Sequence, residues 1–113
     1  MVEMELFDVD LVKVSSLFWE LPETWYKIKP LTWSRLVHID SKLWEVGDEV
    51  LGAATFYENM TAIMCFLKYN SKTMVCSVRV TAQDLYRPSR AKKHEDLFMS
   101  AVRSLLSSFE RAA

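Results

Sequence analysis

The sequence predicts an α+β fold in which helices cover one face of an antiparallel sheet. Two amphipathic helical patterns, one near each end of the chain, enclose a central region in which apolar and polar residues alternate. The clearest alternation runs from Thr61 to Ala82, and turn-forming residues at 69–72 divide it into two strands. A sheet covered on one face has this pattern, because its other face meets water.

The length and composition are those of one folded domain. The chain has 113 residues, half of them hydrophobic and 12% aromatic, with only two glycines and three prolines. We expect residues 1–113 to form a single domain with a frayed stretch at 1–8. The 14 basic residues are offset by 15 acidic ones, which gives no global field for nucleic acid or anionic lipid.

The sequence also predicts a cytoplasmic location. Its longest apolar runs are too short to cross a bilayer, and acidic residues near the N-terminus stand where a signal peptide would be basic. The two cysteines, Cys65 and Cys76, are expected to be reduced core thiols, as is usual in that compartment.

The first helix is expected to begin near Asp8 or Asp10, whose carboxylates can accept hydrogen bonds from free amides, and to end before Pro22. Its apolar positions recur at steps of three and four residues and form a stripe for packing on a sheet: Leu11, Val14, Leu17, Phe18 and Leu21. Trp19 lies beside this stripe. It is therefore either the wall of a groove or an ordinary packing residue.

The middle of the chain is less regular. Residues 22–30 are bracketed by prolines and predict an extended connection that can hold an edge strand at 26–28. From 31 to 37 the pattern fits either strand or helix. Residues 40–51 predict a short amphipathic helix limited by its glycines, and a strand at 53–57 and a turn at 58–60 follow.

The stretch 61–82 predicts a β-hairpin with a tight turn at Asn70-Ser71. Strand alternation divides its side chains between two faces. The first face is apolar and is expected to be buried, in the pairs Ile63 with Val78, Cys65 with Cys76, and Leu67 with Met74. The second is apolar with a polar rim and carries Met64, Phe66 and Lys68 opposite Ser77, Val75 and Thr73, with Arg79 beyond them. Such a surface suits the docking of a peptide better than catalysis.

The last helix is expected from about His94 to Arg111, after a polar connection at 84–93. Acidic residues in its first turn and Arg111 in its last complement the helix dipole. Its apolar face comprises Leu97, Phe98, Ala101, Val102, Leu105, Leu106 and Phe109. The basic run at 87–93 is interpreted as a solvated loop, although it could also touch acidic headgroups.

Motifs for catalysis are lacking. Neither His38 nor His94 has a nucleophile at a recognisable spacing, and the sequence has no zinc or calcium motif and no glycine-rich phosphate loop. We therefore expect no enzymatic activity, no metal and no cofactor. An enzyme would have to be built on His38, Asp40 and one thiol.

Three segments resemble a known family. These are Leu17-Phe18-Trp19-Glu20-Leu21-Pro22, the hairpin from Leu67-Lys68-Tyr69-Asn70 to Val78-Arg79-Val80, and the terminal amphipathic helix. Their order resembles the platform subdomain, a TBP-like fold, that ends the beta subunits of adaptor protein complexes, which sort cargo into coated vesicles. The chain is most similar to the appendage of adaptor complex 4, which has the platform without an immunoglobulin-like sandwich.

The resemblance implies a coat component at the trans-Golgi network that recruits accessory proteins through short peptides and meets the membrane only indirectly, beside the other subunits of its complex. It assigns one groove wall to Trp19. The family's groove tyrosine and glutamate fall at Met64 and Ser77, and both are departures from its pattern. Loss of the acidic group at Ser77 and gain of a methionine at position 64 favour hydrophobic peptides over basic or polar ones. The expected ligand has a Leu-Phe-like core, the type attributed to tepsin.

The candidate peptide site therefore combines one helix residue with the mixed hairpin face. It comprises Trp19, Met64, Phe66, Val75, Ser77 and Arg79. The alternative is a small α+β domain that uses the same face to dimerise or to pack against the rest of a larger chain.

Overall fold

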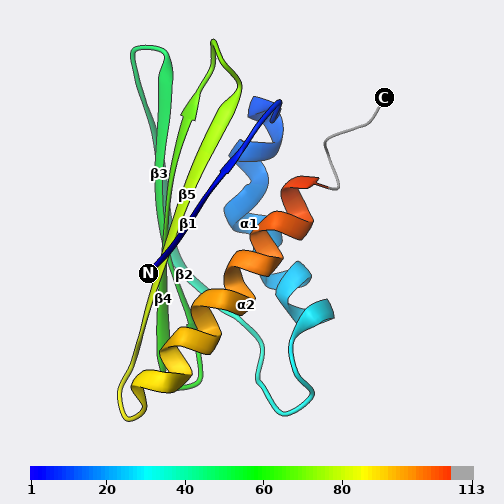
Figure 1. The fold of residues 1–113 in the computed structure, drawn as a ribbon, viewed down its shortest axis with the longest axis vertical. Coiled ribbons are helices and arrows are strands. Elements are labelled where there is room, and N and C mark those ends of the chain that lie inside the picture. The colour runs from blue at the N-terminus through cyan, green and yellow to red at the C-terminus, as the bar shows by residue number, and fades with distance from the viewer. Residues whose placement is uncertain (108–113) are drawn as a thin grey trace.

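The computed structural model describes residues 1–107 and contains a five-stranded antiparallel sheet with both helices packed on one side of it (Figure 1). The predicted α+β class, with helices on one face of an antiparallel sheet, is confirmed. Along the chain the elements are β1 (Val2–Leu6), α1 (Leu11–Ile28), β2 (Val37–Val46), β3 (Glu49–Glu58), β4 (Thr61–Asn70), β5 (Val75–Asp84) and α2 (Pro88–Ser107).

The sheet has the strand order β1-β5-β4-β3-β2, so β2 to β5 form a meander and β1 pairs with the last strand. The turns that join β2 to β3 and β3 to β4 each contain a residue in the left-handed region, Gly47 at φ 61° and Asn59 at φ 57°. Gly52 lies where a Cβ atom would come within 2.7 Å of Leu43 Cδ2, so a larger residue there would force the side chains apart.

The β4–β5 hairpin has a longer loop than the sequence predicts. Asn70 pairs with Val75, and the Asn70 side chain accepts hydrogen bonds from the amides of Lys72 at 2.9 Å and Thr73 at 3.1 Å. Met74, at φ 59°, returns the chain to β5. The predicted two-residue turn and its residue pairs are therefore wrong.

The observed register nevertheless keeps each side chain on its predicted face. Ile63 pairs with Ala82, Cys65 with Val80, and Leu67 with Val78. The register differs from the predicted one by an even number of residues, and only an odd shift exchanges the two faces. The exception is Met74, which lies in the loop and is exposed.

The cysteines are consequently not opposite each other. Cys65 pairs with Val80 and Cys76 with Tyr69, and both thiols are buried and free. Burial raises the pKa of Cys65, and it raises the pKa of Cys76 to about 12. Both are therefore protonated core side chains at neutral pH.

Helix α1 does not end before Pro22 but continues to Ile28. A proline inside a helix removes one backbone hydrogen bond, and tertiary packing offsets that cost here. Leu21 and Trp25 are fully buried on either side of Pro22, and the Trp25 indole donates to the Ser34 carbonyl at 3.4 Å. The predicted extended connection at 22–30 and its edge strand are wrong.

The predicted helix at 40–51 is also wrong, because these residues form β2, the Gly47 turn and the start of β3. β2 begins at Val37, and residues 31–36 lead to it without regular structure. The strand expected at 53–57 lies within β3, and the turn expected at 58–60 is confirmed at Asn59-Met60.

The two ends of the chain differ from expectation in opposite ways. Val2–Leu6 form a paired strand where frayed residues were expected, and α2 begins at Pro88, so that most of the basic run belongs to its first turns. The predicted apolar face of α2 packs into the core through residue 106. Phe109 and Arg111 lie outside the described residues.

The core lies between the sheet and the two helices. Phe56 of β3 contacts both helices, with ring centroids 6.4 Å from Phe18 and 5.2 Å from Phe98. The fully buried Tyr69 donates its hydroxyl to the Val9 carbonyl at 2.7 Å, which ties the start of α1 to β4. Within residues 1–107, this packing leaves the opposite face of the sheet without a helix.

Candidate peptide-binding surface

The side of the sheet that faces away from the helices is the open face (Figure 1). Alternation along the strands determines which residues lie on it, and all of them are exposed or half-buried. In its central part they are Leu51, Ala53, Thr55 and Tyr57 of β3, Ala62, Met64, Phe66 and Lys68 of β4, Val75, Ser77, Arg79 and Thr81 of β5, and Glu3 and Glu5 of β1.

A groove of about 630 Å³ runs over β1, β5 and β4 on this face. Three of the predicted site residues line it, namely Phe66, Ser77 and Arg79. Phe66 lies directly opposite Arg79 and is 41% exposed, which is high for an aromatic residue in the middle of a sheet. We call this hollow the open-face groove.

The wall of the groove formed by β1 is acidic. Glu3 Oε1 lies 3.1 Å from Arg79 Nε, and Glu5 Oε2 accepts a hydrogen bond from the Ser77 hydroxyl at 3.5 Å. Both contacts are exposed to water, so each contributes little to the folded state and a ligand can replace it. The groove therefore offers an aromatic wall on β4 and exchangeable charges on β1 and β5.

Glu3 and Glu5 were not among the predicted site residues. The family resemblance implies that an acidic group is lost at Ser77, whereas in the structure β1 places Glu5 beside that serine. The alternation Val2-Glu3-Met4-Glu5-Leu6 was a readable strand signal. Its pairing with β5 joins residues far apart in the chain, and no local pattern reveals such pairing.

The remaining predicted residues divide into two groups. Met64 lies two residues before Phe66 on β4, and its neighbours on the adjacent strands are Thr55 and Thr81. Val75 is the first residue of β5 and pairs with Asn70. Both are half-buried and lie on the same face as the groove without lining it. Five of the six predicted residues therefore share one face.

Trp19 does not join them. It lies on α1, is 71% exposed, and its ring centroid is 4.7 Å from that of His38, which stacks on Phe56 in the core. Trp19 is thus on the helical side of the sheet. There it lines a separate hollow of about 550 Å³ with residues of α1 and α2: Glu20, Glu23, Thr24, Lys27, Ser104 and Leu105.

A larger hollow of about 950 Å³ lies at the end of the sheet near the start of α2. The buried carboxylate that lines it, Glu95, is already paired. Its Oε2 accepts from the Ala82 amide at 2.9 Å, and its Oε1 lies 2.9 Å from the Met1 ammonium. This carboxylate is therefore not available to orient a ligand.

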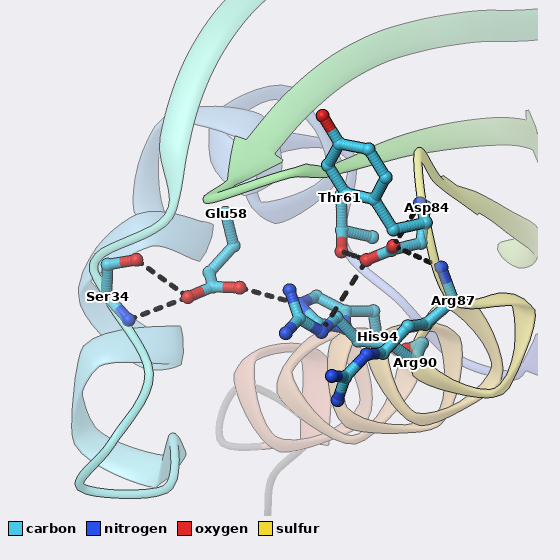
Figure 2. Close-up of polar contacts among 8 residues, drawn as sticks. Ser34, Glu58, Thr61, Asp84, Arg87, Arg90 and His94 are labelled. Atoms are coloured by element: carbon cyan, nitrogen blue, oxygen red, sulfur yellow. Dashed lines mark hydrogen bonds and ion pairs between the residues drawn. The ribbon is translucent and has the colours of Figure 1, made fainter.

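A buried polar cluster joins the connection before β2 to α2 (Figure 2). Glu58 Oε2 accepts from the amide and the hydroxyl of Ser34, each at 2.7 Å, and Glu58 Oε1 lies 2.7 Å from His94 Nε2. The other ring nitrogen of His94 lies 2.8 Å from the Arg90 carbonyl. Both ring nitrogens therefore have an oxygen partner within hydrogen-bond distance.

The surroundings of this pair are aromatic and dry. His94 is 1% exposed, and Trp33 stacks on its ring at a centroid distance of 4.3 Å. Burial raises the pKa of Glu58, but the hydrogen bonds from His94 and Ser34 outweigh burial and leave this pKa lowered.

The cluster is not arranged for nucleophilic catalysis. The carboxylate of Glu58 stands between the Ser34 hydroxyl and His94, whereas a serine nucleophile needs the imidazole as its neighbour. The other grouping, His38 with Asp40, is divided by a β-bulge. His38 pairs with Phe56 on the covered face, whereas Asp40 pairs with Thr55 on the open face.

A second carboxylate, Asp84, fixes the entry to α2 (Figure 2). It accepts from the Thr61 hydroxyl at 2.6 Å and from the amides of Tyr86 at 2.9 Å and Arg87 at 2.8 Å. These hydrogen bonds, with that of Thr61 the largest contributor, lower the pKa of Asp84 to about 2. Sequence reasoning missed both clusters. The members of the Glu58 cluster are distant in the chain, and so is Thr61 from Asp84, whereas the hydrogen bonds from the Tyr86 and Arg87 amides to Asp84 form a local Asx turn that the sequence could have indicated.

Comparison of the chain with protein-family models, curated proteins and solved structures finds no match. Neither helix in residues 1–107 is long and apolar enough to cross a membrane. The same residues contain no group of three or more histidine, cysteine or acidic side chains placed to hold a metal ion. The geometry of the open face is thus the main support for a functional proposal.

Proposed function

We propose that this chain is a non-enzymatic protein-interaction module whose open-face groove binds a short apolar peptide. The observation that carries the proposal is Phe66, an exposed aromatic side chain in the middle of a regular sheet that borders a hollow of about 630 Å³. Aromatic anchors in such hollows are typical of binding hot spots.

The residues around Phe66 define the ligand. An apolar side chain of the peptide packs against Phe66, and Met64 beside it adapts to the shape of the next one. Two carboxylates, Glu3 and Glu5, and two cations, Lys68 and Arg79, line the groove. A basic residue of the peptide pairs with one of the glutamates by displacing its exposed contact with β5. A flexible peptide with two or three such contacts binds with a dissociation constant on the order of micromolar.

The adaptor resemblance extends the proposal to a cellular role. In that role the chain recruits accessory proteins with tepsin-like Leu-Phe motifs to a vesicle coat at the trans-Golgi network. Weak single contacts suit a coat, since many of them act together.

The test is a heteronuclear NMR titration of the chain with a peptide that has a Leu-Phe core and one lysine. We expect shifts concentrated at residues 3–5, 64–68 and 75–79. Phe66→Ala should weaken binding about 5- to 30-fold, which corresponds to about 1–2 kcal/mol. The matched control is Tyr57→Ala, an exposed aromatic residue on the same face but outside the groove, which should leave the affinity unchanged.

Other outcomes would point elsewhere. Shifts confined to the neighbourhood of Trp19 or Tyr57 would place the ligand in another hollow and contradict the proposal. A dimer that forms with increasing concentration and is lost in Phe66→Ala would instead support the alternative, in which the open face is covered by a second copy. Unfolding of Phe66→Ala would show that this side chain belongs to the core.

A further inference from the structure

In the described part of the chain, the outer edge of β2 is unpaired. β2 is the last strand of the sheet, and within residues 1–107 no strand pairs with its outer side. It is ten residues long, twice the length of β1 at the other edge. An exposed edge of this length presents a row of backbone donors and acceptors that can pair with another strand.

Half of the β2 side chains are apolar, and these are poorly covered. Five of them are between 36% and 55% exposed, on both faces of the strand, and these are Val37, Ile39, Leu43, Trp44 and Val46. By contrast, β1 alternates apolar residues with glutamates that make polar contacts on β5. The β2 edge therefore has more to gain from a partner strand than the β1 edge.

The charges of β2 indicate which strand that partner is. Asp40 and Lys42 lie on the open face on either side of Ser41, since they pair with Thr55 and Ala53 of β3. Within residues 1–107 the Asp40 side chain makes no hydrogen bond or ion pair, and Lys42 lies over the Trp44 ring at 5.7 Å. Both charges are thus available to another chain.

Antiparallel pairing of β2 with itself about Ser41 places each Asp40 opposite the Lys42 of the other copy. The twofold axis of this pairing is perpendicular to the sheet and passes between the two Ser41 residues, so the helices of both copies lie on the same side of the joined sheet. Centring the pair on Asp40 or on Lys42 instead would put like charges opposite each other, which is unfavourable. Of these three registers, the charge pattern favours the one about Ser41, which alone places opposite charges across the interface.

We propose that β2 pairs with β2 of a second copy of this chain, antiparallel and centred on Ser41, so that two sheets continue as one. Leu43 of each copy then faces the bulged Ile39 of the other, and four partly exposed apolar side chains, two from each copy, become buried. Phe66 lies on β4, two strands away from this edge, so the open-face groove of each copy stays accessible.

The test is sedimentation velocity of the full 113-residue chain over a range of concentrations. The unsubstituted chain should form a dimer as concentration rises. Asp40→Lys and Lys42→Asp should each weaken dimerisation at least about tenfold, because the twofold axis repeats every like-charge contact. The double variant Asp40→Lys/Lys42→Asp restores opposite charges across the interface and should restore the dimer.

Phe66→Ala is the control for the open face and should dimerise like the unsubstituted chain. All substituted residues are exposed, and circular dichroism will verify that each variant is folded. A chain that stays monomeric, single variants that dimerise normally, or a double variant that fails to recover would each overturn the proposal. A dimer abolished by Phe66→Ala would also overturn it, because the contact would then lie on the open face.

Discussion

Neighbouring residues of β4 meet two different environments. Ile63, Cys65 and Leu67 are sealed under the helices, whereas Met64 and Phe66 between them lie on the open face. The covered face holds large apolar side chains in mutual contact, and the open face holds a few apolar side chains among exposed charges. One strand therefore contributes both to the stability of the fold and to a surface free to bind.

The polar groups of the two faces differ in the same way. On the covered side, Glu58 and His94 form a closed network in which each buried polar atom has a partner. On the open side, the Arg79–Glu3 pair has both side chains more than half exposed and contributes about 0–1 kcal/mol. Substitutions should accordingly destabilise the protein on one face and alter binding on the other.

The largest loss of stability is expected from His94→Ala. This change leaves the buried Glu58 carboxylate without its His94 partner and removes the ring on which Trp33 stacks. Breaking a buried pair by removing one partner costs about 3–5 kcal/mol in the free energy of unfolding, which urea denaturation will measure. The control, Lys92→Ala on the exposed side of the same helix, should cost no more than about 0.5 kcal/mol. Equal losses in both variants would contradict a structural role for the pair.

Adjacent residues of β4 provide the next test. Ile63→Ala should lower the free energy of unfolding by about 2–5 kcal/mol, because Ile63 is fully buried and its truncation leaves a cavity. Met64→Ala, one residue further on the open face, should cost less than about 1 kcal/mol, since no enclosed cavity forms there. The comparison fails if the two variants unfold at the same urea concentration.

The division of β4 and β5 into two faces was predictable from sequence, and their register was not. Alternation at Ile63 to Leu67 defines the faces independently of the partner strand, so the even error in register left them correct. The length of the loop depended on Asn70, whose side chain binds two amides and extends the turn to Met74. That preference competes with a two-residue turn and is not visible in the hydrophobic pattern.

Errors elsewhere arose where tertiary contacts override local signals. Pro22 is a valid helix stop in isolation, but the burial of Trp25 carries α1 past it. The stretch 40–51 has apolar residues at spacings that fit a helix or a strand, and the hairpin turn at Gly47 decides between them. β1 was missed because it pairs with β5, a strand about 70 residues later in the sequence. The acidic wall of the candidate site, which β1 carries, was missed for the same reason.

Acid should destabilise the covered face through Glu58 and Asp84, two carboxylates there whose pKa is lowered. The pKa of Glu58 is lowered from its ordinary value of 4.5, and that of Asp84 from 3.8 to about 2. At a pH between the folded pKa and the ordinary pKa of each carboxyl, the unfolded chain binds more protons than the folded one. The free energy of unfolding therefore falls as the pH falls through this range. The contribution of Asp84 to the free energy of unfolding is fully present above about pH 4 and is lost as the pH falls to about 2.

Asp84→Asn isolates this last and smallest effect. The variant should be less stable than the unsubstituted chain at pH 5, and the difference should shrink as the pH is lowered toward 2, because the protonated aspartate also lacks the charge. Thr61→Val, which removes the largest contributor to the low pKa of Asp84, should give a pH dependence between the two. Urea denaturation at half-unit pH steps measures all three curves. If the stability difference between Asp84→Asn and the unsubstituted chain stays constant with pH, the charge of Asp84 does not stabilise the fold and only its hydrogen-bond geometry does. Glu58, with its partner His94, would then be the carboxylate whose charge matters on the covered face.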